Sequence, residues 1–301
     1  MGKKIFTLFV LAMLLTLALA ACGGAPAEAS TVRVGSKEFT EQYLLGNMYE
    51  MLLDNAGFDA QFTPVGGTAE NHQALLEDEI DLYPEYTGTA LLTQLEMEYD
   101  PSMSAQDVYD TVKAAYEEQY DLTLLQPTDF NNTYCLTTTR DKAEELGLQT
   151  VSDLAAAAPD LVFGTTQEFV ERPDGLPGLQ ETYGGFNFKE VVALDPGLLY
   201  TGIDQGDIDV TTCFGTDGQI AAYDLVVLED DKGFWPPYPA APVVRQDVLD
   251  ENPEIATVLN DLSSRLDGET MRQLNWEVAG NGREPDEVAH EFLVSEGLLE
   301  E

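Results

Sequence analysis

Patterns typical of β-strands and α-helices alternate along most of this chain, and that alternation limits its fold more than any other feature. Residues 31–34 form a strand pattern, and a helix with apolar residues on one face is predicted from Phe39 to Asn55. A second strand pattern covers Phe58–Val65, and a further helix is predicted to begin at Thr68. The alternation continues to about residue 245, after which helices predominate. This order predicts an α/β protein with layers of helices on mainly parallel sheets.

One arrangement occurs twice, at positions about 125 residues apart. Leu76–Leu82 leads into Tyr86–Thr89, and Ile203–Val210 leads into Phe214–Gly218. Both are predicted to be a helix end, a tight turn, a short strand and a Thr/Gly turn that opens a new helix. Loops at the carboxyl ends of parallel strands bind ligands in open α/β sheets. The two stretches therefore belong to two lobes that face each other across a cleft, or they repeat a common α/β pattern by chance.

The segment Asp81–Thr89 favours recognition of a small ligand. It places two tyrosines, a carboxylate and a Thr-Gly-Thr turn just past a predicted strand. Aromatic faces can hold a cation, and hydroxyl or N–H donors can hold an anion. The sequence contains no Gly-x-Ser-x-Gly motif, and its two histidines, His72 and His290, lack zinc-protease spacing. A secreted hydrolase that uses pairs of acids is the alternative from the enzyme class.

The formal net charge of −41 excludes nucleic acid and electrostatic adsorption to anionic lipid as partners. The acidity would attract a cationic ligand. A solubilising surface, or one adapted to salt, explains it equally well.

The first residues predict export. Two lysines precede the apolar run Ile5–Ala21, which is too short for a membrane span and is followed directly by Cys22 and two glycines. This pattern predicts a lipoprotein signal peptide over residues 1–21, a lipidated Cys22 and a flexible tether over 22–30. An ordinary secretory signal with a chance cysteine is the alternative. The remaining cysteines, Cys135 and Cys213, could pair outside the cytoplasm, but their spacing alone does not decide this.

Seven segments in a common order resemble the substrate-binding proteins of quaternary-amine ABC importers, the glycine betaine, carnitine and choline uptake family. They are GSKEFTEQ (35–42), VGGT (65–68), DLYPEYTGT (81–89), NNTY (131–134), EFVERPDG (168–175), GTDGQI (215–220) and DDKGFWPPYPAAPVVR (230–245). The resemblance implies a type II periplasmic-binding-protein fold, in which two α/β lobes close on a ligand cleft about a two-strand hinge. Lobe I would comprise residues 31–130 plus 237–301, and lobe II residues 131–236.

The resemblance also implies roles for single residues. The aromatic box for the quaternary ammonium group would consist of Tyr86, Tyr134, Tyr238, Phe214 and Cys213. The polar end for a ligand carboxylate would consist of Lys37, Gln42, Thr89 and Arg172. Supporting loops would contribute Gly67, Thr68, Asn132, Thr216 and Asp217. No metal and no cofactor are implied.

The chemistry of the ligand supports such a box independently. A trimethylammonium group has no N–H to donate, so shape, dispersion and charge must hold it, and each aromatic face contributes about 0.5–2 kcal/mol. One position departs from the family, which usually has a further aromatic residue where this chain reads Thr212-Cys213-Phe214. If Cys213 faces inward the box loses a wall, and Phe214 can replace it.

The expected function follows from the resemblance. It is an extracytoplasmic, lipid-anchored, monomeric binding protein that captures a quaternary amine and delivers it to a permease with a cytoplasmic ATPase subunit, for osmoprotectant uptake. It would not be an enzyme. Glycine betaine, choline, carnitine, proline betaine and ergothioneine all remain candidate ligands. A receptor of the same fold for another zwitterion or an amino acid is the alternative.

Overall fold

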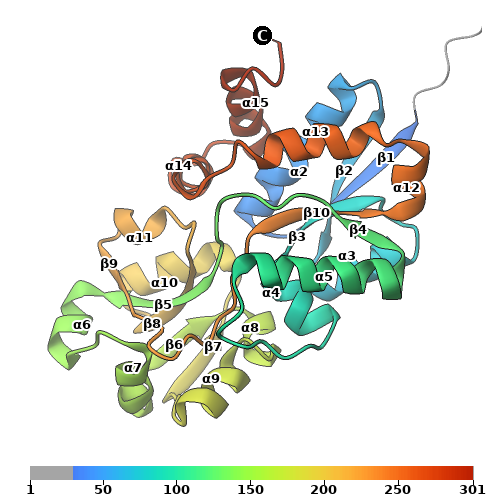
Figure 1. The fold of residues 1–301 in the computed structure, drawn as a ribbon. Helices are drawn as coiled ribbons and strands as arrows, with labels where there is room; N and C mark the ends of the chain where they lie inside the picture. The colour runs from blue at the N-terminus through green and yellow to red at the C-terminus, as the bar shows by residue number, and fades with distance from the viewer. Residues whose placement is uncertain (1–29, 301) are drawn as a thin grey trace, which may run out of the picture. The chain divides into compact units, whose positions relative to one another are not determined.

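The computed structural model describes residues 30–300, which contain two five-stranded sheets with helices around them (Figure 1). The α/β prediction is thereby confirmed. The predicted signal peptide over 1–21, Cys22 and all of the tether except Ser30 lie outside the described residues. No helix within residues 30–300 combines the length and the apolar character that a membrane crossing requires.

The first sheet has the strand order β2-β1-β3-β10-β4. Its strands are β1 (Thr31–Lys37), β2 (Asp59–Gly66), β3 (Leu82–Tyr86), β4 (Leu122–Leu124) and β10 (Ala240–Arg245). Strand β1 pairs in parallel with β2 and β3, whereas β10 runs antiparallel to β3 and β4. The antiparallel strand comes from a part of the chain more than 100 residues beyond the others.

The second sheet has the order β7-β6-β8-β5-β9 and the same kind of pairing. Its strands are β5 (Tyr134–Thr139), β6 (Val162–Thr165), β7 (Glu190–Ala193), β8 (Val210–Phe214) and β9 (Leu225–Val227). Strand β6 is parallel to β7 and β8, and β5 is antiparallel to β8 and β9. Both sheets are therefore mixed, and the expectation of mainly parallel sheets holds only for the strands joined by helices.

Helices connect the strands and close the chain. In the first half they are α2 (Thr40–Asn55), α3 (Thr68–Leu76), α4 (Thr87–Thr89), η1 (Ala90–Gln94), α5 (Ala105–Tyr120), α6 (Arg140–Leu146), α7 (Val151–Ala157), η2 (Ala158–Asp160), α8 (Gln167–Glu171) and α9 (Leu176–Tyr183). They continue with η3 (Pro196–Leu198), α10 (Leu199–Gln205), α11 (Gln219–Ala222), α12 (Gln246–Glu251), α13 (Glu254–Ser263), α14 (Gly268–Ala279) and α15 (Pro285–Ser295). Helix α5 begins with a capping box formed by Ser104 and Asp107.

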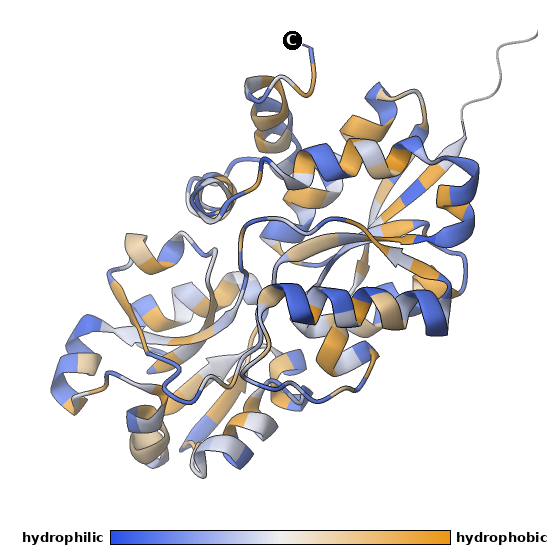
Figure 2. Ribbon diagram, viewed as in Figure 1, coloured by the Kyte–Doolittle hydropathy of each residue, from blue (hydrophilic) through white to orange (hydrophobic). Residues whose placement is uncertain are grey.

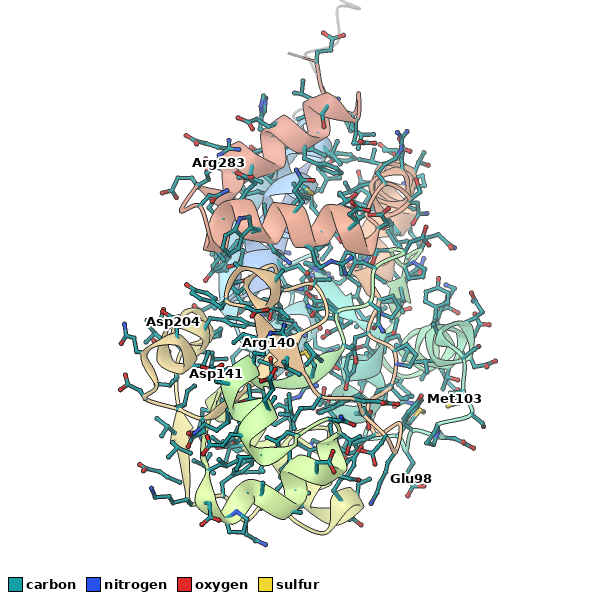
Figure 3. All side chains as sticks on the ribbon, turned by 90° about the vertical axis from the view of Figure 1, so that its left-hand side faces the viewer. Glu98, Met103, Arg140, Asp141, Asp204 and Arg283 are labelled. Atoms are coloured by element: carbon teal, nitrogen blue, oxygen red, sulfur yellow. A yellow bond between two sulfur atoms is a disulfide. The ribbon has the colours of Figure 1, made fainter. Side chains whose placement is uncertain are left out.

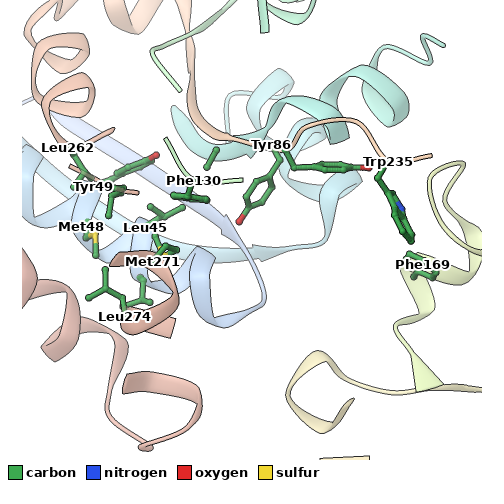
Figure 4. Packing of buried hydrophobic residues seen from close by; sticks show 14 of the residues in the cluster. Leu45, Met48, Tyr49, Tyr86, Phe130, Phe169, Trp235, Leu262, Met271 and Leu274 are labelled. Carbon is green, nitrogen blue, oxygen red and sulfur yellow. The ribbon is translucent and has the colours of Figure 1, made fainter. Parts of the chain in front are cut away.

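The helices carry apolar residues on the side that faces the core and polar residues elsewhere, so both colours appear along them in Figure 2. Figure 4 shows one result, in which Met48 and Tyr49 of α2 pack near Leu262, Met271 and Leu274 of the C-terminal helices. Charged side chains such as Arg140 and Arg283 lie on the outside (Figure 3), where they pair with acids. Such exposed pairs add little stability, about 0–1 kcal/mol each.

Two segments carry the chain between the sheets, one between β4 and β5 and the other between β9 and β10. They are hydrogen-bonded to each other. The amide of Asn132 donates to the Tyr238 carbonyl at 3.1 Å, and the amide of Thr128 donates to the Ala240 carbonyl at 2.8 Å. Two side-by-side connections are the arrangement expected of a two-strand hinge.

A disulfide joins Cys135 of β5 to Cys213 of β8, which the sequence left undecided. The two residues stand directly opposite each other in the antiparallel pairing, with their Cα atoms 4.8 Å apart. The bond lies in a buried apolar cluster of the second sheet with Tyr200, Ile203 and Ile208. It therefore cross-links two neighbouring strands inside one layer.

Candidate functional site

A cavity of about 460 Å³ opens where strands of both sheets end. Lys37 and Tyr86 are the last residues of β1 and β3 in the first sheet, and Phe214 is the last residue of β8 in the second. Helices of the α/β layers begin just beyond these ends. The volume falls within the range of small-molecule sites, about 300–1,000 Å³.

Most of the residues predicted for the site line this cavity. They are Tyr86, Tyr134, Tyr238 and Phe214 from the aromatic set, Lys37, Thr89 and Arg172 from the polar set, and Gly67, Thr68 and Asn132 from the supporting loops. Four predicted residues do not line it, namely Gln42, Cys213, Thr216 and Asp217. The three sets come from segments up to 200 residues apart, and the fold brings most of them to one place.

The aromatic rings form a continuous cluster around Tyr134. The ring centre of Tyr134 lies 4.9 Å from that of Phe214 and 5.8 Å from that of Tyr238, the latter pair being edge to face. Phe39 extends the cluster, because its ring stacks on Phe214 at 5.9 Å and on Tyr86 at 6.3 Å. Sequence reasoning missed Phe39, although it lies inside the quoted segment 35–42.

Phe214 and Cys213 were alternative walls of the aromatic box, and they point in different directions. Successive side chains of a strand face opposite sides of the sheet. Phe214 lines the cavity, whereas Cys213 is fully buried and bonded to Cys135 on the other side. Of the two residues, only Phe214 lines the cavity.

Tyr238 is positioned by a close approach that only glycine permits. A Cβ atom on Gly88 would lie 2.8 Å from the Pro237 carbonyl oxygen and 2.8 Å from the Tyr238 ring. The Thr-Gly-Thr turn singled out in the sequence thus lets a ring from the second connecting segment pack on the end of β3.

The ammonium group of Lys37 is already paired. Its Nζ lies 2.6 Å from Oε1 of Glu85, and both side chains are at least nine-tenths buried. Glu85 also accepts hydrogen bonds from the Tyr83 hydroxyl at 2.9 Å and from Nε2 of Gln94 at 2.9 Å. The sequence suggested Glu85 as a carboxylate near a possible site and, with Asp81, as one of the acid pairs of a hydrolase, but it did not predict the pairing with Lys37.

The guanidinium group of Arg172 is held by Asp174 in a bidentate pair. Nε lies 2.7 Å from Oδ1 of Asp174, and the second nitrogen lies 2.6 Å from Oδ2. Weaker contacts reach Glu168 at 3.0 Å and the hydroxyl oxygens of Thr68 and Thr89 at 3.4 Å and 3.3 Å. The guanidinium carbon lies 5.4 Å from the ring centre of Tyr134. A ligand carboxylate would share both cations with resident acids.

Gln42 and Thr216 support the site from behind. The side chain of Gln42 accepts from the Lys37 amide at 3.1 Å and donates to the Pro84 carbonyl at 2.9 Å, which ties the ends of β1 and β3 together. The carbonyl oxygen of Thr216 accepts from Nδ2 of Asn275 in α14 at 3.1 Å. Both residues hold backbone in place, so they act on the cavity through their neighbours.

Asp217 fixes the turn that carries Phe214. Its Oδ2 accepts hydrogen bonds from the Phe214 amide at 2.9 Å and from the Tyr200 hydroxyl at 2.6 Å. Burial raises the pKa of Asp217 from its ordinary value of 3.8 to about 7, with a small contribution from the charge of Glu41. The hydrogen bonds act in the opposite direction but do not outweigh burial.

This shift predicts a stability that falls as pH rises. Because the folded-state pKa of Asp217 lies above the unfolded one, the folded protein binds the proton more tightly, and this stability is lost between about pH 4 and pH 7. Asp217→Asn imitates the protonated acid, so the difference between variant and wild type should grow over that window to roughly 4 kcal/mol in favour of the variant. Urea unfolding at pH 5, 6, 7 and 8 measures it. A difference that does not change with pH would show that Asp217 does not titrate in this range.

Groups of histidine, cysteine or acid side chains arranged to hold a metal ion are absent from residues 30–300. The candidate site is therefore an aromatic cluster beside two buried ion pairs. Such a surface can hold an organic cation on its rings and an anion on its exposed donors.

Comparisons with known proteins agree with this geometry. Residues 30–295 match the family model described as the substrate binding domain of ABC-type glycine betaine transport systems. A glycine-betaine-binding protein of Pseudomonas aeruginosa is 36% identical over 285 residues, which cover 91% of each chain. An ergothioneine transport permease/ergothioneine binding protein of Helicobacter pylori, EgtU, is 36% identical over 267 residues, 88% of this chain and 47% of that relative. The chain thus spans about half the length of EgtU.

A solved structure agrees in fold as well. The crystal structure of a glycine betaine/carnitine/choline ABC transporter protein superposes with a TM-score of 0.71 at 31% identity, covering 89% of this chain and 99% of that one. The two-lobed fold predicted from the sequence is therefore confirmed.

Proposed function

Because the chain belongs to the family of substrate-binding domains of ABC-type glycine betaine transport systems, we propose that its cavity binds a quaternary ammonium compound. Membership of this family also confirms the prediction that the protein is a binding protein and not an enzyme, and that it works outside the cytoplasm with a permease. The observation that carries the proposal is the ring cluster of Tyr86, Tyr134, Phe214 and Tyr238 around one cavity.

The rings would hold the ammonium end of the ligand. A trimethylammonium group is large, weakly hydrated and unable to donate hydrogen bonds, so it gains more from aromatic faces than sodium or a lysine side chain does. Phe39 adds a ring that the proposed box did not include. The donors of Lys37, Thr89 and Arg172 would meet a carboxylate at the other end, where the ligand has one.

The boundaries of the lobes and the attachment to the cell belong to the same proposal. We place lobe I at residues 31–130 plus 237–301 and lobe II at 131–236, since the two connecting segments bond to each other near residues 128–132 and 238–240. The apolar run Ile5–Ala21 before Cys22 supports a lipid anchor on the outer face of the membrane. We also propose that the protein acts as a monomer.

Calorimetric titration of residues 25–301 tests the ligand class. The panel comprises glycine betaine, choline, carnitine, proline betaine, ergothioneine and a set of amino acids. We expect micromolar or tighter binding of at least one quaternary amine. The variant Tyr134→Ala should weaken that binding roughly five- to thirtyfold, since one ring contributes about 1–2 kcal/mol.

The alternative ligands give a different pattern. A receptor for an amino acid would bind that amino acid and ignore every quaternary amine, and Tyr134→Ala would then change affinity little. Ergothioneine, for which the Helicobacter pylori relative is named, carries a trimethylammonium group and would keep the role of the rings. No measurable binding of any compound in the panel would contradict the proposal.

A further inference from the structure

Two tyrosines of the cavity donate their hydroxyl hydrogens to buried carboxylates. The Tyr86 hydroxyl donates to Oε1 of Glu41 at 2.7 Å, and the Tyr238 hydroxyl donates to Oδ2 of Asp174 at 2.6 Å. Glu41 is 2% exposed and Asp174 is 1% exposed. Neither carboxylate lines the cavity that the rings of Tyr86 and Tyr238 line. Bonds of this charge-assisted kind are short and strong in a buried setting.

The other two rings of the cluster lack this arrangement. The Tyr134 hydroxyl forms no hydrogen bond with any residue between 30 and 300, and Phe214 has no hydroxyl. The face of Tyr134 instead lies beside the guanidinium group of Arg172. The rings of the cluster are therefore of two kinds, those whose hydroxyl donates to a buried carboxylate and those without such a bond.

Both carboxylates accept further hydrogen bonds besides those from the tyrosines. Glu41 also accepts hydrogen bonds from Nδ2 of Asn132 at 2.7 Å and from Nδ2 of Asn275 at 2.9 Å, and these donors oppose the rise in its pKa that burial causes. Asp174 accepts two bonds from Arg172.

The phenol protons stay on their oxygens. Burial and the adjacent carboxylates hold the pKa values of Tyr86 and Tyr238 well above the ordinary value. Each pair is thus a neutral phenol that donates to a carboxylate, and not a phenolate that accepts from an acid.

A phenol that donates its hydrogen to a carboxylate attracts a cation to its ring more strongly than a phenol without that bond. Donation to a carboxylate raises the electron density of the ring. At Tyr86 the Glu41 carboxylate adds its own field from behind, whereas at Tyr238 the field of Asp174 is offset by Arg172. We propose that Glu41 and Asp174 act through Tyr86 and Tyr238 to set the selectivity of the cavity for a permanent cation over a neutral group of the same shape. This inference rests on the proposed function and makes Glu41 and Asp174 positioning residues, which do not touch the ligand.

Pairs of ligands that differ only in charge test the inference. Choline is compared with 3,3-dimethylbutan-1-ol, and glycine betaine with 3,3-dimethylbutanoate. In each of these neutral analogues a quaternary carbon replaces the nitrogen, so that the trimethylated end carries no charge, while 3,3-dimethylbutanoate keeps the carboxylate of glycine betaine. The variants are Glu41→Gln, Tyr86→Phe and Tyr238→Phe, with Tyr134→Phe as the matched control that removes a hydroxyl without a carboxylate partner. Affinities are measured at pH 8 by calorimetry, with competition for weak ligands, after thermal unfolding has shown that each variant is folded.

We expect Glu41→Gln, Tyr86→Phe and Tyr238→Phe each to weaken binding of the amine about tenfold, while the affinity for the neutral analogue changes less than twofold. Tyr134→Phe should change both by less than threefold. The double variant Glu41→Gln with Tyr86→Phe should bind the amine no more weakly than the worse of its two parents, because both changes remove the same coupling.

Two results would overturn the inference while the proposed function stands. One is an equal loss for the amine and its neutral analogue, which marks a structural role. The other is a double variant whose loss is the product of the single losses, which marks independent effects. A wild-type protein that binds no quaternary amine would overturn the proposed function as well. The wild-type titration therefore distinguishes failure of the proposed function from failure of this inference alone.

Discussion

Replacing Arg172 by methionine is expected to lower the free energy of unfolding by about 3–5 kcal/mol. Asp174 would remain 1% exposed without the cation that binds both of its oxygens, and an uncompensated buried charge carries this cost. Binding of a carboxylate ligand should be lost at the same time. Urea unfolding, followed by the fluorescence of Trp235, whose indole N–H donates to the Asp174 carbonyl at 2.9 Å, measures the first effect.

The double variant Arg172→Met with Asp174→Asn separates structure from ligand binding. Removing both charges should restore most of the stability, since neither partner is left unpaired. In this background we expect choline, which has no carboxylate, to bind within a few-fold of a variant carrying Asp174→Asn alone. Glycine betaine should bind at least tenfold more weakly than it does to that variant. An equal loss for the two ligands would show that Arg172 acts only as the partner of Asp174.

The sequence could predict those cavity residues that lie in or next to a recognisable strand or turn. Tyr86 and Thr89 follow a strand that is recognisable from its pattern, and both line the cavity. Phe39 and Glu41 lie in a quoted segment, yet their roles depend on rings and amides that reach them from distant parts of the chain. No periodicity within residues 35–42 indicates such partners.

The acids were the hardest part to predict. The sequence contains 55 acidic residues, and nothing in it distinguishes Glu85 and Asp174 from the acids on the surface. What distinguishes them is burial beside Lys37 and Arg172, which is a property of the folded chain alone. The antiparallel strands of the two sheets could not be predicted for a related reason. Strand β10 pairs with β3 and strand β5 pairs with β8, and these partners are far apart in the sequence, so no local pattern indicates the pairing.

Reduction of the disulfide between Cys135 and Cys213 is expected to lower the free energy of unfolding by about 2–5 kcal/mol. The bond closes a loop with a sequence separation of 78, and a loop of that length restricts the unfolded chain considerably. Urea unfolding of residues 25–301 with and without reductant measures the change, and thiol counting shows that reduction is complete. Starting after Cys22 leaves these two as the only cysteines.

Ligand affinity at low temperature should change less than threefold on the same treatment. The five register pairs between β5 and β8 hold Phe214 opposite Tyr134 without the bond, and Cys213 faces away from the cavity. The variant Cys135→Ala with Cys213→Ala serves as the control, since reductant should leave its stability unchanged. A large loss of affinity on reduction would instead mean that the cross-link, and not the strand pairing, keeps Phe214 in the aromatic cluster. Stability unchanged after complete reduction would contradict the loop argument.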